Sequence, residues 1–210
     1  MKELIARYPS LAACAAAIEK GRELLIDSFN RGGKLLVCGN GGSCADSEHI
    51  VGELMKGFLY KREISASFRQ KLQQVAGMDA EVLTDNLQGA LPAISLTAHN
   101  AFNSAYANDK RHDMAYAQQV YGYGRAGDVF LGISTSGNSV NVVYAALTAK
   151  AMGLTVIGLT GKNACRLDAV ADVVVHVPQE ETYKAQELHV PIYHYWCAAC
   201  EEAFFGEGKQ

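Results

Sequence analysis

The stretch of residues 34–53, KLLVCGNGGSCADSEHIVGE, constrains the fold more than any other part of this chain. Residues 34–38 form a short apolar run with the length of a buried strand. Three glycines then permit a tight turn and a close approach of the backbone to a ligand. They are Gly39, Gly41 and Gly42. Ser43, with Asp46 three residues later, predicts a capping box at the start of a helix.

A strand, a glycine turn and a helix N-terminus together predict an anion site. Free backbone N–H groups and the positive end of the helix dipole converge at such a place. One turn further on, His49 and Glu53 stand four residues apart, so their side chains leave the same face of the helix. A phosphate cradle with a base and a carboxylate beside it indicates chemistry on a small phosphorylated molecule.

Neither feature is decisive alone. The segment GNGGS is not a dinucleotide fingerprint, because Cys44 stands where the third glycine belongs. It is not a P-loop, because no Lys-Ser/Thr pair follows it. A purely structural turn would use the same glycines, and a solvated helix pair would have the same His–Glu spacing.

The composition is that of an ordinary globular protein of 210 residues, with 49% hydrophobic and 20% charged residues. The net charge of −3 argues against a nucleic-acid partner. The six cysteines lack the compact spacing of a disulfide framework, and no run has the length of a transmembrane helix. The Ala-rich run at residues 11–18 is too short and too helix-like for a signal peptide. We therefore expect a cytoplasmic protein without a membrane partner.

Short apolar runs alternate with helical patterns along the chain. The expected strands cover residues 34–38, 92–97, 128–133, 154–160 and 173–177. The expected helices cover residues 2–30 with an interruption at Pro9, 43–56, 113–123, 139–152 and 182–205. This alternation predicts a three-layer α/β fold, in which helices cover both faces of a parallel sheet. In such sheets ligands bind beyond the carboxyl ends of the strands.

One domain is expected over residues 1–210, with an N-terminal helical segment at residues 1–31 and an insertion at about residues 60–90. In the insertion, apolar residues recur at helical spacing until Gly77 breaks the pattern, and a second short helix is expected at residues 80–87. The insertion is a hairpin, a lid or an oligomer contact, and the sequence leaves these open.

The loop at residues 134–139 lies between a predicted strand and a predicted helix. Its polar residues are Ser134, Thr135, Ser136, Asn138 and Ser139. Hydroxyls, backbone amides and a helix dipole suit a phosphate monoester without a Lys or Arg. The lack of a fixed cation argues against a nucleotide cofactor. Such clusters are often plain loops, but two polar loops at one sheet edge favour binding. Ser139 is also expected to cap the helix that follows.

The expected C-terminal helix contains Gln186 and His194, which are about 80° apart around its axis and can face one pocket across two turns. Pro191 lies between them and would kink the axis. We interpret His189 as a packing histidine. The segment WCAAC at residues 196–200 resembles a thioredoxin motif, but it falls inside a helix, so core packing is expected.

Taken together, these motifs resemble the sugar isomerase (SIS) domain family, and most closely its phosphoheptose isomerase branch. The motifs are CGNGGS at 38–43, HxxxE at 49–53, GDVFLGISTSGNS at 127–139, VIGLTGK at 156–162, and QExH with a second His at 186–194. They cover most of the chain in order. The resemblance implies a flavodoxin-like sheet of five strands. It also implies a homo-oligomer, usually a homotetramer, with active sites at subunit interfaces.

The resemblance implies roles for individual residues. Glu53 would correspond to the base that abstracts a proton, and His194 to the partner acid. The sugar phosphate would be bound by residues matching Asn40, Gly41, Gly42, Ser43, Asp109, Ser134, Thr135, Ser136, Ser139 and Gln186. Some relatives carry zinc on residues matching His49, Glu53, Gln186 and His194, and others work without metal.

The implied reaction agrees with the chemistry of these residues. Converting a ketose phosphate to its aldose needs a base beside the carbonyl and an acid for the enediol, each worth about 10²–10⁴-fold. A zinc ion would polarise the carbonyl, but Gln is an unusual zinc ligand, so the metal stays open. The expected substrate is sedoheptulose 7-phosphate, and its aldose product would feed heptose and lipopolysaccharide synthesis for the cell envelope.

The chain departs from the family pattern at two places. The insertion is longer than the usual connection, and Tyr183 stands where an acidic residue is expected. Both departures bear on the identity of the sugar rather than on the reaction. Residues 107–113 also resemble the replication-initiator-associating protein of the same family, which binds a protein partner and lacks the carboxylate and the second histidine. Glu53 and His194 favour the enzyme over such a non-catalytic, phosphosugar-binding regulator.

Overall fold

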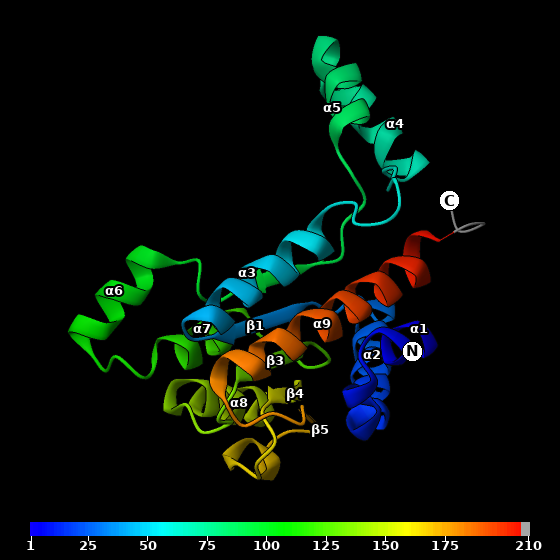
Figure 1. Cartoon of the computed structure of the whole chain (residues 1–210). Helices are drawn as coiled ribbons and strands as arrows, with labels where there is room; N and C mark the ends of the chain where they lie inside the picture. Colours follow the sequence, from blue (N-terminus) through cyan, green and yellow to red (C-terminus); the bar gives the residue numbers. More distant parts are fainter. Residues whose placement is uncertain (207–210) are drawn as a thin grey trace.

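A parallel sheet of five strands forms the centre of the protein, which a computed structural model describes over residues 1–206 (Figure 1). The strands are β1 (Leu35–Gly39), β2 (Ala93–Ser95), β3 (Val129–Ser134), β4 (Thr155–Thr160) and β5 (Val173–His176). Their order is β2-β1-β3-β4-β5, and all four neighbouring pairs are parallel. This is the flavodoxin-like order, with its switch point between β1 and β3. The expected α/β fold is confirmed.

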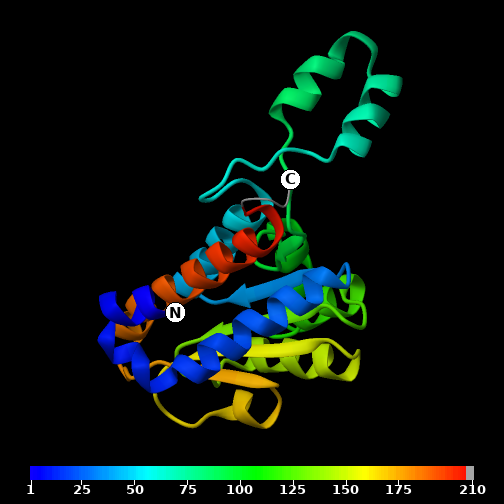
Figure 2. The ribbon, with the colours of Figure 1, turned by 90° about the vertical axis from the view of Figure 1, so that its right-hand side faces the viewer.

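Two hydrophobic cores lie on opposite faces of the sheet, because successive side chains of a strand point to opposite faces. Leu35 and Val37 pack in the first core, and Leu36 and Cys38 pack in the second. The first face is covered by α1 (Lys2–Arg7), α2 (Ala15–Asn30), α3 (Gly42–Met55) and α9 (Thr182–Phe205). The second is covered by α7 (Ala115–Tyr123) and α8 (Val140–Ala151) (Figures 1 and 2).

The N-terminal helical segment is interrupted at Pro9, as expected. Pro9 begins a 3-10 helix (Pro9–Cys14) that joins α1 to α2. The start of α3, in contrast, differs from the prediction. Gly41 is the N-cap residue and no side chain caps the helix, so the expected capping box of Ser43 and Asp46 is wrong. The glycine turn starts the helix earlier than expected, which leaves Ser43 within its first turn.

Helix α6 (Asn100–Asp109) lies where the sequence predicts no helix. None of its residues is buried, so it has no apolar stripe from which a helical period can be recognised. It projects from the sheet beside α7 (Figure 1).

The insertion is a helical hairpin made of α4 (Ala66–Val75), a 3-10 turn (Gly77–Asp79) and α5 (Ala80–Asn86). The two expected helices and the break at Gly77 are confirmed. The hairpin stands away from the rest of the molecule at the end of α3 (Figures 1 and 2). Several of its apolar side chains face solvent, and Met78 is 99% and Val75 81% exposed. Over residues 1–206, every helix is too short or too polar to cross a membrane.

Candidate active site

The backbone of the glycine turn after β1 packs closely against the first turn of α3 and against α9. A Cβ atom at Gly39 would lie 2.6 Å from the Cβ of Ser43, and one at Gly42 would lie 2.6 Å from Nε2 of Gln186. Gly41 has a φ of 57°, in the left-handed region that favours glycine. The turn therefore requires glycine, and Gln186 of α9 covers the start of α3.

The serine loop, residues 134–139, holds its hydroxyls together at the carboxyl end of β3. Ser134 Oγ lies 3.0 Å from Ser139 Oγ and 3.4 Å from Ser136 Oγ. Ser139 is the N-cap residue of α8, as expected, but its hydroxyl bonds Ser134 instead of a helix N–H group. The backbone carbonyl of Thr135 accepts a hydrogen bond from Gly161 N at 2.9 Å, which ties the loop to the end of β4. Clustered hydroxyls at a helix N-terminus suit a phosphate group.

A pair of amides joins the glycine turn to the serine-loop helix. Asn40 Nδ2 donates to Asn141 Oδ1, and Asn141 Nδ2 donates to Asn40 Oδ1, both at 2.9 Å. The Tyr116 hydroxyl donates to the carbonyl of Gly39 at 3.0 Å. A small cavity of about 120 Å³ lies beside these groups, lined in part by Tyr116 and Asn141. The two predicted phosphate-binding loops thus lie side by side at the carboxyl ends of β1 and β3.

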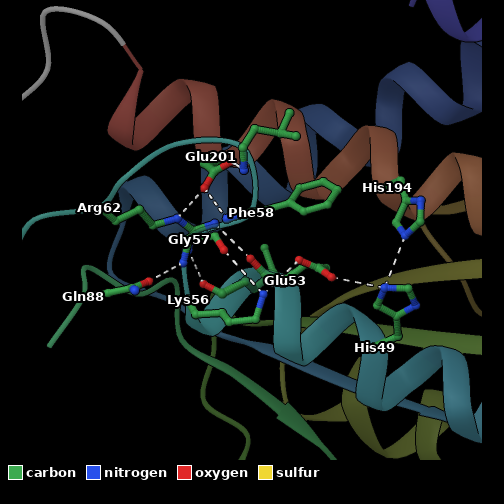
Figure 3. Close-up of polar contacts among 11 residues, drawn as sticks. His49, Glu53, Lys56, Gly57, Phe58, Arg62, Gln88, His194 and Glu201 are labelled. Atoms are coloured by element: carbon green, nitrogen blue, oxygen red, sulfur yellow. Dashed lines mark hydrogen bonds and ion pairs between the residues drawn. The ribbon is translucent and has the colours of Figure 1, made fainter. Parts of the chain in front are cut away.

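His49, Glu53 and His194 meet between α3 and α9 (Figure 3). His49 Nε2 lies 3.1 Å from Glu53 Oε1 and 3.3 Å from His194 Nε2. Because α3 and α9 pack side by side, two segments that are 145 residues apart in sequence supply this cluster. The spacing of His49 and Glu53 indicated a shared face, and the structure adds His194 from another helix.

Tyr193 contacts Nδ1, the second ring nitrogen of His49. Its hydroxyl lies 3.2 Å from His49 Nδ1 and 3.2 Å from Asp46 Oδ1. Burial raises the pKa of Asp46 and, together with the nearby Asp46 carboxylate, raises the pKa of Tyr193. Burial and the neighbouring His49 lower the pKa of His194, so its ring is neutral at pH 7. A neutral ring can donate a hydrogen bond from one nitrogen and accept at the other.

A buried ion pair fixes the end of α3 against α9 (Figure 3). Arg62 Nε donates to Glu201 Oε1 at 2.7 Å, and both side chains are fully buried. The other guanidinium nitrogens donate to the carbonyls of Glu53 (2.9 Å) and Leu54 (2.6 Å), at the end of α3. Glu201 also accepts from Phe58 N at 2.8 Å. The sequence reasoning missed this clamp, whose partners are 139 residues apart.

Two predicted site residues lie away from the His49 cluster within one chain. Gln186 precedes His194 by eight residues, which is about 12 Å along a helix axis. Within the cluster, Glu53 lies about 16 Å along α3 from Gly42, against which Gln186 packs. Asp109 is the last residue of α6, is exposed, and accepts a hydrogen bond from Asn108 Nδ2. A single chain therefore presents the predicted phosphate-binding loops and the predicted acid–base cluster as two separate groups.

His189 and the WCAAC segment are packing residues, as expected. His189 is fully buried, and its Nε2 donates to the carbonyl of Thr160 at 3.2 Å. Cys197 and Cys200 are buried thiols, and burial raises the pKa of both. Trp196 Nε1 donates to the carbonyl of Ile18 at 2.8 Å, which joins α9 to α2.

Comparison with known proteins gives consistent matches. The family model described as the SIS domain matches residues 3–69 and 78–161. The phosphoheptose isomerase of Rhodospirillum rubrum is 34% identical over 92% of this chain and 89% of its own length. The solved structure of the phosphoheptose isomerase of Neisseria gonorrhoeae is 31% identical, covers 96% of this chain and 94% of that chain, and has a TM-score of 0.75. That of Francisella tularensis is 28% identical, with coverages of 94% and 91% and a TM-score of 0.76.

Proposed function

Because this chain belongs to the SIS domain family, in its phosphoheptose isomerase branch, we propose that it interconverts a ketose phosphate and an aldose phosphate. The proposed substrate is sedoheptulose 7-phosphate, and the product would serve heptose synthesis for the cell envelope. The observation that carries the proposal is the cluster of His49, Glu53 and His194, in a chain that also holds a hydroxyl-lined phosphate cradle.

The proposed reaction moves one proton between neighbouring carbons of the sugar and a second proton between their two oxygens. The Glu53 carboxylate takes the proton from the carbon beside the carbonyl and returns it to the other carbon. His194, whose pKa is lowered by burial and by His49, relays the second proton from the sugar hydroxyl to the carbonyl oxygen as negative charge develops there. The serine loop and the dipole of α8 hold the phosphate. The interactions of His49 and Tyr193 orient the other groups.

The complete site in this proposal is shared between subunits of a homo-oligomer. Within one chain, the backbone of Glu53 lies about 16 Å along α3 from Gly42, against which Gln186 packs, so the base and the glycine turn are separated along the helix. One subunit would therefore supply the phosphate cradle and Gln186, and a second would supply His49, Glu53 and His194. Asp109, on the projecting helix α6, would reach a site in the same way. A homotetramer in the cytoplasm is the proposed form.

Imidazole and carboxylate, two of the ligand types that zinc takes, meet at the acid–base cluster, although the three side chains do not all lie within 4.8 Å of one another. Glu53 Oε1 and His194 Nε2 both lie within 3.3 Å of His49 Nε2, so one ring nitrogen faces two partners but has only one proton or lone pair to offer. Side-chain rotations would place all three around one cation, with Gln186 of another subunit as a fourth ligand. When bound, zinc would polarise the substrate carbonyl.

A coupled assay across five-, six- and seven-carbon ketose phosphates tests the function. We expect turnover on the seven-carbon substrate, and a loss of at least about 10²-fold in kcat for Glu53→Gln, because the base is removed. Glu63→Gln, a change of the same kind at an exposed side chain, should keep wild-type activity. Loss of activity with a chelator and its return with zinc would support the metal.

The same assay separates the enzyme from the non-catalytic regulator. Absence of turnover on every ketose phosphate, while a phosphosugar binds at full occupancy, would overturn the isomerase and favour the regulator. Wild-type activity in Glu53→Gln would remove Glu53 from the mechanism.

A further inference from the structure

We propose that Cys165, Asp168 and His176 form a second metal site, for a divalent ion of the zinc class, behind the serine loop. Cys165 Sγ, a carboxylate oxygen of Asp168 and a ring nitrogen of His176 all lie within 4.8 Å of one another. Thiolate, carboxylate and imidazole are the three ligand types that zinc takes in proteins. Within residues 1–206, no other three His, Cys, Asp or Glu side chains meet this condition.

The distances between the ligand atoms are close to those of a metal site. Asp168 Oδ1 lies 3.6 Å from Cys165 Sγ and 2.8 Å from His176 Nε2. Bonds of about 2.0–2.3 Å to a tetrahedral ion would place neighbouring ligand atoms roughly 3.3–3.8 Å apart. Small side-chain rotations therefore suffice to admit the ion. The side chains of His176 and Asp168 are 31% and 35% exposed, so water can take the fourth position.

Neighbouring backbone groups orient the His176 ring and the Asp168 carboxylate. His176 Nδ1 lies 2.9 Å from the carbonyl of Gly161, which only accepts, so Nδ1 carries the proton. In the neutral ring, the lone pair of Nε2 then faces Asp168 Oδ1, which is also an acceptor. A proton on Nε2, or a metal ion in its place, satisfies both groups. A carbonyl on the far nitrogen is the usual partner of a metal-bound histidine.

The Asp168 carboxylate is oriented by the backbone. Its Oδ2 accepts a hydrogen bond from Cys165 N at 2.8 Å, in the 3-10 turn Arg166–Ala169. Because Oδ2 is occupied by this bond, Oδ1 faces the space between the Cys165 thiol and the His176 ring. Cys165 and Asp168 stand three residues apart at the 3-10 turn, and His176 is the last residue of β5. The three ligands are thus oriented before a metal binds.

The proposed site adjoins the serine loop directly. A Cβ at Gly137 would lie 2.2 Å from Cys165 Sγ, so the thiol packs against the loop backbone. Arg166 N donates to Asn138 Oδ1 at 2.9 Å. A metal that fixes Cys165 would therefore brace the phosphate-binding loop. This site is distinct from the His49 cluster, because its ligands lie beside β4 and β5 and the cluster lies between α3 and α9.

Cobalt binding tests the proposal, because a thiolate bound to Co²⁺ gives a charge-transfer absorption band in the near ultraviolet. The full chain is stripped with a chelator and titrated with Co²⁺. We expect the band in the wild type and in His49→Ala, which disables the other cluster. We expect its loss in Cys165→Ser and its retention in Cys44→Ser, a matched change at the other partly exposed cysteine.

Two further variants keep the test decisive if Cys165→Ser does not fold. Asp168→Asn and His176→Gln should each weaken Co²⁺ binding by at least about tenfold, with circular dichroism unchanged. Absence of the band in the wild type, or an equal band in Cys165→Ser, would overturn the proposal. Equal Co²⁺ affinity in Asp168→Asn and His176→Gln, or a band that saturates only at millimolar Co²⁺, would overturn it too. Because the readout is spectroscopic, its failure leaves the isomerase proposal unaffected.

Discussion

The histidines of this chain differ in burial, and burial decides what each can do. His49 and His194 are partly exposed and bond each other, so protons and ligands can reach them. His189 is fully buried, and its Nδ1 has no hydrogen-bond partner among residues 1–206. Burial lowers the pKa of His189 to about 4. Exposure therefore leaves His49 of α3 and His194 of α9 available for the proposed chemistry, whereas His189 of α9 is a packing residue.

His189 should make the stability of the protein depend on pH between about 4 and 6.5. The unfolded chain binds a proton at His189 below about 6.5, whereas the folded chain does so only below about 4. The stabilisation is thus complete above about pH 6.5 and is lost as the pH falls towards 4, by up to about 3 kcal/mol. We expect His189→Gln, which can still donate to Thr160, to reduce this dependence.

The measurement is urea unfolding at pH 4.5 and pH 7. His112→Gln, a control at an exposed histidine, should keep the wild-type difference between the two pH values. An unchanged pH dependence in His189→Gln would show that the buried ring does not titrate as described.

At the scale of helices and strands, much of the fold follows from the sequence. The strands are short apolar runs, and the helices that cover the sheet place apolar residues in the two cores. The exposed helix α6 has no such period, and the start of α3 depends on the backbone of Gly41 rather than on the side chain of Ser43. The sequence pattern therefore predicts the elements whose apolar residues are buried. It does not predict an exposed helix or a helix start that a backbone conformation sets.

The site is less predictable for a physical reason. The His49–Glu53 pair is a spacing within one helix, and it can be seen in the sequence. The contacts of His194 with His49 and of Arg62 with Glu201 join segments more than a hundred residues apart. Helix packing creates these contacts, and no local pattern encodes them. Helical spacing linked His194 only to Gln186, and its place beside Glu53 as the partner acid entered the prediction through the family resemblance.

The clamp of Arg62 and Glu201 should stabilise the protein and position Glu53. Replacing one partner of a fully buried ion pair leaves the other charge unpaired, which costs about 3–5 kcal/mol. Arg62→Met also removes the donors that hold the carbonyls of Glu53 and Leu54. We therefore expect a large loss of unfolding free energy in urea. Under folding conditions we expect a lower kcat with a nearly unchanged KM, because the phosphate loops are distant.

Arg69→Met, seven residues further along the chain in α4, is the matched control. Its guanidinium pairs with Asp85 at 3.6 Å on the surface, and such pairs contribute about 0–1 kcal/mol. If Arg62→Met were as stable as Arg69→Met, the buried clamp would not be a main support of this region.

At the scale of the whole molecule, the hairpin is the part that a single chain explains least. Its exposed apolar residues include Val75, Met78 and Val82. An apolar face on a projecting element is typical of a surface that another protein covers. We expect Val75→Lys with Met78→Lys to lower the mass of the oligomer in light scattering, with the helical content retained. Gln74→Lys, at an exposed polar position, should not. An unchanged mass in the double variant would place the subunit contacts elsewhere.

The sharing of one active site between subunits is tested most directly by complementation. Glu53→Gln removes the base, and Ser134→Ala weakens the phosphate cradle, so each variant alone should have little activity on the ketose phosphate. In hybrid oligomers formed by co-expression, some sites combine an intact base from one subunit with an intact cradle from the other. We predict recovery of about a quarter of the wild-type activity for random pairing across a two-fold interface. No recovery in hybrids that contain both chains would contradict a shared site.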